Sequence, residues 1–376
     1  MSLPAPLLDP TDPREEVAAA LREWLHLQRL LALRPQDAVA ALAKAPDPTA
    51  ALRRCGERTP PDTAWLDAAV ATLSRQQAVA LPWTSPLYPE RARQLSDAAP
   101  LLLVRGDPGL LQRPAVAIVG ARAATGYGRV VAEQFAGELA AAGLVVVSGL
   151  ALGIDSVAHG AALAVGGTTL AVQACGPDII YPGRHHGLAR RILEQGALVT
   201  EFPPGTRPRP GFFPLRNRLI SALAATLLVV EARERSGSLV TATHAADQGL
   251  EVWAVPGPLS SPTSAGTNRL IFDGADIALS PQLILESLQR KGVLPPPPPP
   301  NRADRAGSLL PAAKKPSALV SALLHQPMTR DELAQRLELA PENLAVELLE
   351  LELAGAVIED RDGRLRVVSP QKVPGL

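Results

Sequence analysis

Short apolar runs alternate with segments of helical spacing along the middle of the chain. Each run is too short for a helix, is rich in branched side chains and is followed by glycine, serine, arginine or proline, as expected of strands buried on both faces of a parallel sheet. This alternation predicts an α/β domain over residues 86–290: a Rossmann-like, doubly wound, mostly parallel sheet with helices on both faces. The predicted strands are 116–120, 144–149, 168–175, 197–202, 226–232 and 251–257.

Residues 14–80 carry apolar side chains at helical spacing, with prolines between the segments. Val17, Leu21 and Leu25 form one such stripe. The pattern predicts a small N-terminal helical (SAM-like) bundle over residues 1–85. Because no polar residues cluster in it, we expect a packing or interaction module without chemistry. The run Leu101–Val104 predicts an edge strand that leads into the sheet domain.

Six consecutive prolines, Pro295–Pro300, separate the sheet region from a C-terminal module. Their composition favours an extended spacer, so we predict a Pro-rich linker over residues 291–315. A capping-box pattern at Thr329 and Glu332 predicts the start of a helix, and strand-like runs around Asp362 and Gly363 predict a hairpin. With further helices at 318–324 and 342–354, these elements predict a winged-helix-like domain over residues 316–370.

The third predicted helix of this module is acidic. Residues 342–354 contain four glutamates and neither lysine nor arginine. A recognition helix in duplex DNA lies beside the phosphate backbone, which a row of carboxylates repels. We therefore expect a protein-contact or structural role for the module, and keep a winged-helix regulator that reads duplex DNA as an alternative.

Composition restricts the partners and the compartment. Lys+Arg and Asp+Glu both number 37, so a contact with nucleic acid or membrane has to come from a local patch. The two cysteines, Cys55 and Cys175, lie far apart without metal-ligand spacing, which fits a reducing compartment. The first residues lack a leader pattern, and no apolar stretch has the length of a membrane span. We expect a cytoplasmic protein without a metal or a membrane partner.

The loop after the first predicted strand of the sheet domain has the outline of a phosphate site. Gly120 ends the strand, and Arg122 and Thr125 precede a helix, so backbone amides and a positive helix terminus point toward a bound anion. The carboxyl ends of parallel strands meet at one edge of a sheet. Ser148 and Gly149, which follow the next strand, are therefore expected to lie nearby.

Dinucleotide and nucleoside-triphosphate sites are not indicated at this edge. The first turn lacks the G-x-G-x-x-G spacing, and Ser148-Gly149 stands where an acidic residue would hold a ribose. No Gly-Lys-Ser/Thr sequence occurs anywhere in the chain. We therefore expect no cofactor.

Positive charge is concentrated between residues 205 and 238. This stretch has six arginines against two acidic residues, together with two of the five phenylalanines. Arginines that pair with phosphates, beside an aromatic ring that stacks on a base, are what single-strand binding requires. Phe213 and Arg216 are candidates for these two roles; the alternative is that Phe213 caps the core. Ser236 and Gly237 open a helix whose free amides form a second anion site.

An aspartate and three histidines between residues 155 and 186 are further polar candidates of the sheet domain. Asp155 is placed to cap the helix that follows the second strand, and His159 on that helix is expected to pack rather than to act as a base. His185 and His186 are expected to face solvent or to contact phosphate weakly.

Six motifs, in this order and at this spacing, resemble the DprA (Smf) family of DNA-processing proteins: VGARAATGYG, SGLALGIDSVAHGAAL, FFPLRNRLI, EARERSGSLVTA, VWAVPGPL and GTNRLIFDGA. The resemblance covers residues 88–280. It implies a Rossmann-like domain that binds single-stranded DNA without sequence preference and forms a homodimer. It also implies that the protein helps to load the RecA recombinase during natural transformation and recombination, without catalytic turnover.

Site residues follow from the same resemblance. Arg122, next to Gly120, is implied to hold a phosphate, and Phe213 to stack on a base. The N-terminal bundle lacks the glycine hairpin of a DNA-contacting helix-hairpin-helix, so we place no DNA contact there. The residues implied around the pocket are Ser148, Gly149, Arg216, Asn217, Arg218, Ser236 and Gly237.

An enzyme remains an alternative to a DNA-binding protein. Related Rossmann-like folds of the phosphoribohydrolase type hydrolyse nucleoside monophosphates to base and ribose phosphate. Glu201 or Glu231 would be the carboxylate of such a site. Neither is followed by the diglycine-threonine loop expected of those enzymes.

Overall fold

The structure is a computed structural model that describes residues 7–31 and 34–295 and, further along the chain, 319, 322–323, 326–337, 339, 344–345, 348, 351–352, 357–360 and 363–367. The chain divides into two compact units, Met1–Pro296 and Pro297–Leu376. Each unit has its own hydrophobic core.

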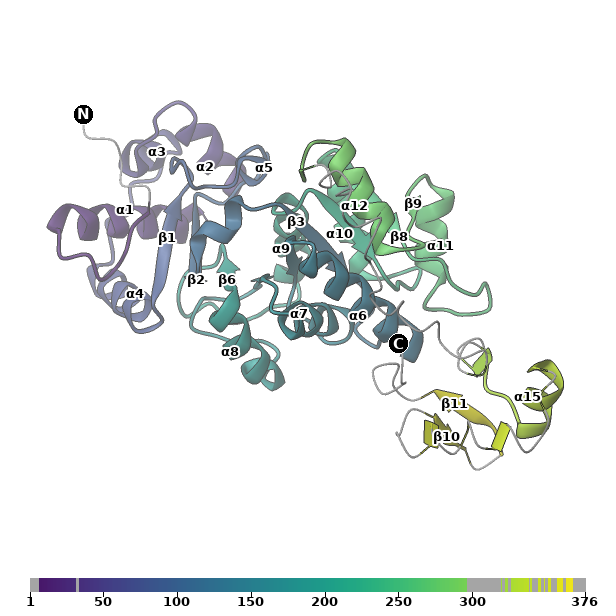
Figure 1. The fold of residues 1–376 in the computed structure, drawn as a ribbon. Helices are drawn as coiled ribbons and strands as arrows, with labels where there is room; N and C mark the ends of the chain where they lie inside the picture. Colours follow the sequence, from purple (N-terminus) through teal and green to yellow (C-terminus); the bar gives the residue numbers. More distant parts are fainter. Residues whose placement is uncertain are drawn as a thin grey trace, which may run out of the picture. The chain divides into compact units, whose positions relative to one another are not determined.

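The strands of the first unit are β1 (Ala78–Pro82), β2 (Leu101–Gly106), β3 (Ala115–Val119), β4 (Val145–Ser148), β5 (Thr169–Val172), β6 (Ala197–Thr200), β7 (Thr226–Val229), β8 (Glu251–Ala254) and β9 (Asp276–Ile277). They form one sheet in the order β1-β2-β6-β5-β4-β3-β7-β8-β9 (Figure 1). Strands β3 to β9 are parallel, and β2 is antiparallel to both of its neighbours. The chain adds β4, β5 and β6 on one side of β3 and then crosses to β7 on the other side, so the strand order reverses between β3 and β7.

The helices that accompany this sheet are α5 (Glu90–Arg93), η1 (Pro108–Gln112), α6 (Gly126–Ala141), α7 (Ile154–Ala164), η2 (Gly183–His185), α8 (His186–Gln195), α9 (Phe212–Ala222), α10 (Gly237–Asp247), α11 (Ala265–Phe272) and α12 (Pro281–Arg290). Helices α6, α7, α8 and α12 pack on one face, and α9 and α10 pack on the other. Alternate residues of β3 point to opposite faces of the sheet. Val116 and Ile118 belong to the core with α6 and α7, and Ala117 and Val119 belong to the core with α9.

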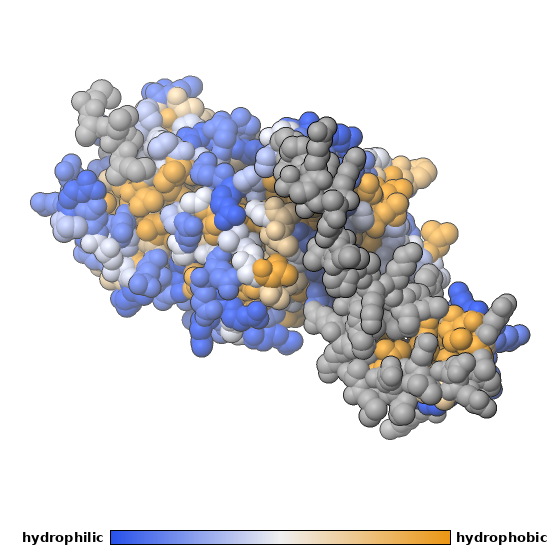
Figure 2. All heavy atoms as spheres, viewed as in Figure 1, coloured by the Kyte–Doolittle hydropathy of each residue, from blue (hydrophilic) through white to orange (hydrophobic). Residues whose placement is uncertain are grey.

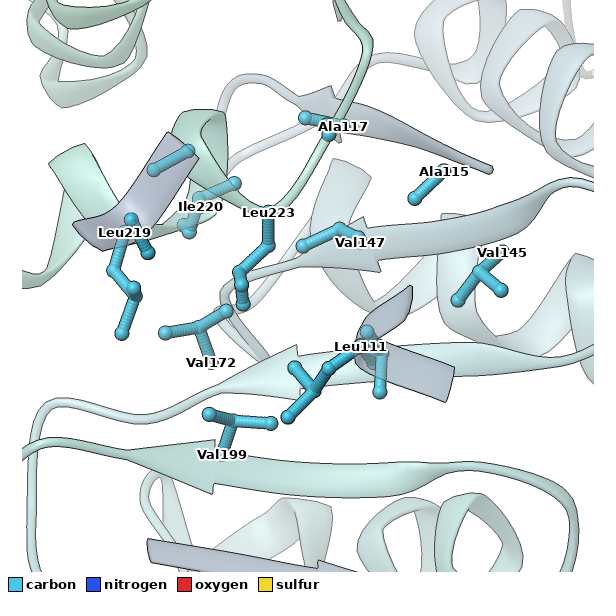
Figure 3. Close-up of a cluster of buried hydrophobic side chains, with 14 of the residues drawn as sticks. Leu111, Ala115, Ala117, Val145, Val147, Val172, Val199, Leu219, Ile220 and Leu223 are labelled. Carbon is cyan, nitrogen blue, oxygen red and sulfur yellow. The ribbon is translucent and has the colours of Figure 1, made fainter. Parts of the chain in front are cut away.

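Figure 3 shows the core beneath α9. Leu219 of this helix and Leu223 at its C-cap lie over Val147 of β4, Val172 of β5 and Val199 of β6, and all five side chains are buried. Burial on both faces explains why the inner strands are continuous apolar runs. The predicted Rossmann-like, doubly wound, mostly parallel sheet is therefore confirmed, and each of its six predicted strands is present.

The N-terminal helices are α1 (Glu15–Leu31), α2 (Pro35–Leu42), α3 (Pro48–Arg54) and α4 (Thr63–Arg75). Their apolar sides pack on Ala80 of β1 and on Leu101 and Leu103 of β2. Gln28 of α1 donates to the Leu101 carbonyl at 3.0 Å, which ties the helices to the sheet. The prediction of an edge strand at Leu101–Val104 was wrong, because β1 pairs with β2 on its outer side. The boundary placed at residue 85 lies between these paired strands.

The C-terminal unit has a helix, α15 (Arg330–Leu337), and an antiparallel strand pair, β10 (Val357–Glu359) and β11 (Leu365–Val367). The capping box at the start of α15 is confirmed: the Thr329 amide donates to Glu332 Oε2 at 2.9 Å, and the Glu332 amide donates to Thr329 Oγ1 at 3.2 Å. The hairpin around Gly363, which has φ of 77°, is also confirmed. The structure describes parts of the two other predicted helices, and the residues that it describes there are helical: 319, 322–323, 344–345, 348 and 351–352. The other residues of these two predicted helices lie outside the described part.

The predicted linker begins later than residue 291. Val293 and Leu294 still pack on the core beside α12, and the Val293 amide donates to the Leu288 carbonyl at 2.9 Å. Residues 296–315 lie outside the described part of the chain.

The exposed surface of the first unit has an apolar patch at the β9 edge of the sheet. Figure 2 shows apolar side chains gathered over β9 and α11. Phe272 is 80% exposed and Leu279 is 71% exposed, and Ile277 lies between them along the chain. None of the helices within the described ranges combines the length and the hydropathy needed to span a bilayer.

Candidate nucleic-acid interface

A cleft of about 550 Å³ opens at the carboxyl ends of β3, β4, β5 and β7. We call it the switch-point cleft, because it lies where the strand order reverses between β3 and β7, the place at which doubly wound sheets bind their ligands. Its lining comes from five segments: 119–123 after β3, Ala151 and Asp155 after β4, Tyr181 after β5, residues of 210–220 in and before α9, and 233–241 at the start of α10.

Arg216 is the most deeply buried cation of the cleft. It is 4% exposed, and its Nη1 donates to the carbonyl of Gly149 at 2.8 Å and to that of Val172. Within the described part of the chain, no carboxylate forms an ion pair with it, and Nη2 has no hydrogen-bond partner. Burial lowers the pKa of Arg216 to about 10, against the opposing charge of Asp155. A bound anion would give this guanidinium a direct ion-pair partner.

Gly149 lies directly beneath this guanidinium. A Cβ atom at position 149 would be 2.6 Å from Arg216 Nη2 and 2.8 Å from its central carbon. Only glycine allows the loop after β4 to approach Arg216 so closely. Gly149 therefore shapes the cleft from below, although its own atoms do not line it.

Asn217 connects Arg216 to the start of α10. Its Oδ1 accepts from Arg216 Nε at 3.2 Å, and its Nδ2 donates to the Gly237 carbonyl at 3.2 Å. Ser236 is the N-cap of α10, and its Oγ accepts from the Ser238 amide at 3.3 Å. The positive end of an 11-residue helix thus faces the same cleft as Arg216.

Phe213 and Arg122 lie together in the cleft. The Arg122 guanidinium is 5.2 Å from the centroid of the half-buried Phe213 ring, within cation–π range. The neighbouring Phe212 instead stacks on the buried Phe202, with the ring centroids 4.6 Å apart. Phe213 therefore lines the cleft, and the alternative that it caps the core is not supported.

The charges that line the cleft are predominantly positive. Four arginines and one aspartate contribute, an excess of three positive charges in a chain whose net charge is zero. The aspartate, Asp155, is buried, and its Oδ2 accepts from the amides of Gly149 at 3.0 Å and Ala151 at 3.3 Å. Burial raises the pKa of Asp155. The side chain braces the loop after β4 and does not cap α7, whose N-cap is Gly153. The four arginines are Arg122, Arg216, Arg233 and Arg235.

The anion position at the start of α6 is occupied by the protein itself. The buried carboxylate of Glu231, which follows β7, accepts from the Thr125 amide at 3.0 Å and from the Thr125 hydroxyl at 2.5 Å. A Cβ atom on Gly128 would be 2.3 Å from the Glu231 carboxyl carbon, so glycine is required there. The amide and hydroxyl of Thr125 are therefore already bonded to a carboxylate, contrary to the predicted phosphate contact.

Two further predicted residues do not reach the cleft. Ser148 is fully buried, and its hydroxyl donates to the Ile118 carbonyl at 2.6 Å, which ties β4 to β3. Arg218 forms ion pairs of 2.7 Å with both Asp97 and Glu201. These side chains hold the fold together. Of the predicted residues, Gly120, Arg122, Phe213, Arg216, Asn217, Ser236 and Gly237 line the cleft.

The carboxylates proposed for an enzymatic site are also committed to internal contacts. Glu201 pairs with Arg218, and Glu231 binds Thr125 and accepts from the Thr263 hydroxyl at 3.4 Å. Neither lines the cleft. The alternative of a nucleotide-hydrolysing site therefore loses both of its candidate residues.

The histidines do not form a site. His159 packs as expected: it is fully buried, its Nδ1 lies 2.6 Å from the Thr169 hydroxyl, and burial lowers its pKa to about 3. His185 is buried as well, with Nδ1 2.9 Å from the Leu150 carbonyl, so the expectation of a solvent-facing side chain was wrong. His186 is exposed. Within the described ranges, no three His, Cys, Asp or Glu side chains come together as a metal site.

Three arginine or aromatic residues of the lining were absent from the predicted site. Arg233 and Arg235 belong to the arginine-rich stretch, and their position between β7 and α10 was a signal that they lie at the same edge. Tyr181 follows β5 by nine residues, too far for its place to be read from the end of the strand.

Comparisons with known proteins agree with this arrangement. The family model for DNA recombination-mediator protein A matches residues 80–289, and that for the DprA winged helix domain matches 295–363. Protein Smf of Escherichia coli (strain K12) is 40% identical over 291 residues, which cover 76% of this chain and 77% of that protein. A putative DNA processing protein DprA of Mycobacterium tuberculosis (strain H37Rv) is 39% identical over 332 residues, covering 86% and 80%.

Two solved structures share the fold. DNA processing protein A of Streptococcus pneumoniae has a TM-score of 0.57 at 32% identity, covering 72% of this chain and 94% of that one. The protein of the same name from Helicobacter pylori, described for its single-stranded DNA binding mode, has a TM-score of 0.51 at 33% identity and covers 54% and 93%.

Proposed function

This chain belongs to the DprA (Smf) family of DNA-processing proteins, and from that premise we propose that its switch-point cleft binds single-stranded DNA without sequence preference. One observation carries the proposal. The cleft joins Arg216, a buried cation without an ion-pair partner among the described residues, to three exposed arginines and the half-buried ring of Phe213. Phosphates are the anions that such a row of arginines selects, and an unpaired base is what stacks on the ring.

A strand of DNA fits this cleft better than a mononucleotide. The arginines come from three separate segments, after β3, within α9 and after β7, so they match a series of phosphates rather than one. The place where a nucleotide cofactor's phosphate would sit, the start of α6, is filled by Glu231. The related Helicobacter pylori protein is described by its binding of single-stranded DNA, which supports the same ligand here.

Binding without catalytic turnover belongs to this proposal. The carboxylate that lines the cleft, Asp155, accepts hydrogen bonds from two loop amides and braces the wall. Base release from a panel of nucleoside monophosphates that is lost in a Glu231→Gln variant would contradict this part of the proposal and favour the enzyme.

Substitution of Arg122 tests the proposed DNA contact. Each phosphate neutralised on a single strand contributes about −0.7 to the slope of log affinity against log salt. We expect Arg122→Ala to weaken binding of a short oligothymidylate about tenfold and to flatten that slope by about one contact. Fluorescence anisotropy over a salt series measures both quantities.

The matched control for Arg122 is Arg190→Ala, which removes an exposed arginine of α8 away from the cleft lining. It should leave both affinity and salt slope unchanged. Equal affinity and slope for Arg122→Ala and the wild-type protein would refute the site.

We also propose that the protein is a homodimer that delivers the strand to the RecA recombinase during natural transformation and recombination, from a cytoplasmic location. The description of the family as recombination mediators supports the delivery. The exposed apolar patch over β9 and α11 is a surface suited to self-association. Faster RecA assembly on strands coated with a single-strand binding protein, reduced by Arg122→Ala, is the expected outcome.

A further inference from the structure

Tyr181 lies in the cleft beside Phe213. Its ring centroid is 5.6 Å from that of Phe213, and the two ring planes are inclined at 52°. Phe213 in turn lies 5.2 Å from the Arg122 guanidinium. Two aromatic rings and a cation thus form one cluster on the lining, with residues from the segment after β5, from α9 and from the loop after β3.

Tyr181 differs from Tyr88 in its exposure, and from Tyr127 in its hydroxyl contact and its place on the cleft lining. Tyr88 is buried, and the hydroxyl of Tyr127 donates to the Pro256 carbonyl at 3.0 Å. Tyr181 is 46% exposed, and its hydroxyl has no hydrogen-bond partner among the described residues. A large ring left this open inside a cleft is available to a ligand.

The spacing of the rings decides how a base can use them. A base sandwiched between two rings needs two stacking distances of about 3.4 Å each, which is more than the 5.6 Å between these centroids. The 52° inclination also prevents parallel stacking on both rings at once. One base therefore cannot stack on both rings at once, and the two ring planes face different directions.

We propose that Tyr181 is a second base-stacking residue, so that the cleft takes two successive bases of the strand, one on Tyr181 and one on Phe213. The inference rests on the proposed function, and deepens it by assigning two successive bases as the part of the strand that the cleft recognises. Stacking is tolerant of sequence because every base has a flat face. Tyr181 and Phe213 would bind the bases of the strand while the arginines bind its phosphates.

The structural alternative is that Tyr181 only supports Phe213 from the side. In that case, Tyr181→Ala would act through Phe213 and would have no effect once Phe213 is replaced. If Tyr181 contacts its own base, Tyr181→Ala instead keeps an effect of its own when Phe213 is absent.

Binding of two oligonucleotides separates these roles: an oligothymidylate, and a strand of the same length whose central nucleotides are abasic. We expect Tyr181→Ala to weaken binding of the oligothymidylate about tenfold and to leave binding of the abasic strand unchanged. Tyr181→Phe keeps the ring and should bind both strands as the wild-type protein does. The loss should persist when Tyr181→Ala is made in a Phe213→Ala background.

The control is Tyr127→Ala, which removes a tyrosine that is 49% exposed but does not line the cleft. The inference is overturned if Tyr181→Ala binds oligothymidylate normally, if it weakens both strands equally, or if its effect disappears in the Phe213→Ala background. Failure of the wild-type protein to bind either strand would overturn the proposed function and this inference with it. Loss of both strands on Arg122→Ala, without any effect of Tyr181→Ala, would keep the function and overturn the inference alone.

Discussion

Two arginines of α9 show how contacts decide the role of a side chain. Arg216 and Arg218 are equally buried, at 4% and 3% exposure, and stand two residues apart, about 200° around the helix. Arg218 is held between the carboxylates of Asp97 and Glu201. Arg216 has only carbonyl and amide oxygens as acceptors and lines the cleft. Arg218 is a structural cation, and Arg216 is the cation that we propose to contact a DNA phosphate.

This contrast predicts opposite effects for matched substitutions. Arg218→Met leaves Glu201 buried without its cation and should lower the free energy of unfolding by about 3 kcal/mol, with little effect on the DNA affinity of the folded protein. Arg216→Met removes a buried charge that has no carboxylate partner in the described structure, so it should change the free energy of unfolding by less than about 1 kcal/mol. It should weaken DNA binding strongly.

Urea unfolding and oligonucleotide titration measure the two effects in the same pair of proteins. Each variant serves as the control for the other, because both remove one buried guanidinium from the same helix. If Arg216→Met were the less stable protein and Arg218→Met the weaker binder, the assigned roles would be reversed.

At the scale of elements, the start of α6 shows how a loop can have the composition of a phosphate site without being one. Thr125 caps the helix, and the helix terminus is close to Glu231 from the loop after β7. A carboxylate at a helix N-terminus satisfies the same amides and the same dipole as a bound phosphate. The link joins the loops after β3 and β7 across the reversal of strand order, so it stabilises the base of the cleft.

Two glycines in the first turn of α6 test this packing. Gly128→Ala places a Cβ atom 2.3 Å from the Glu231 carboxyl carbon, and we expect it to lower the free energy of unfolding by about 1–3 kcal/mol. Gly126→Ala meets no atom within 4 Å and should be neutral or raise stability by up to about 1 kcal/mol. Urea unfolding of the two variants measures the difference, and equal stability would show that Glu231 moves aside at no cost.

The sheet could be predicted from the sequence to a greater extent than the cleft. Strands buried on both faces have to be apolar throughout, which is a local signal, and six of them were found in this way. Strand β9 has two residues and β1 borders the helical bundle, so neither carries that signal. In the cleft, strand ends placed Gly120 and Arg122 correctly. The partners of Thr125 and Ser148 depend on contacts with distant segments, which spacing along the chain does not reveal.

Helical geometry contained one further signal for the site. Residues 216 and 218 lie on opposite sides of any helix, so both could not face one cleft. The positions of Asp97 and Glu201 decide which of the two arginines faces the cleft. Asp97 is more than a hundred residues from Arg218 along the chain, and Glu201 is less than twenty residues from it. The direction of a charged side chain was therefore decided by the tertiary structure.

For the whole molecule, the cleft and the apolar patch are separate surfaces of the first unit. The cleft is lined by residues between 119 and 241, whereas the patch is made by Phe272, Ile277 and Leu279. Strand β9 pairs only with β8 among the described strands, so one side of its backbone is free for another chain. A dimer formed at this edge would leave each copy's cleft open to DNA.

Charge placed on the patch tests this arrangement. We expect the full-length wild-type protein to have about twice the 39.5 kDa mass of one chain in light scattering, and a Phe272→Asp, Leu279→Asp variant to have the mass of one chain. Carboxylates at two well-exposed apolar positions make burial against a second copy costly.

An oligonucleotide too short to join two clefts should bind both proteins equally, because the patch does not contribute to the lining. Val165→Asp is the control, since Val165 is a 51% exposed apolar residue at the end of α7, away from β9. A wild-type monomer, or a dimer that both aspartates leave intact, would exclude this edge as the site of association.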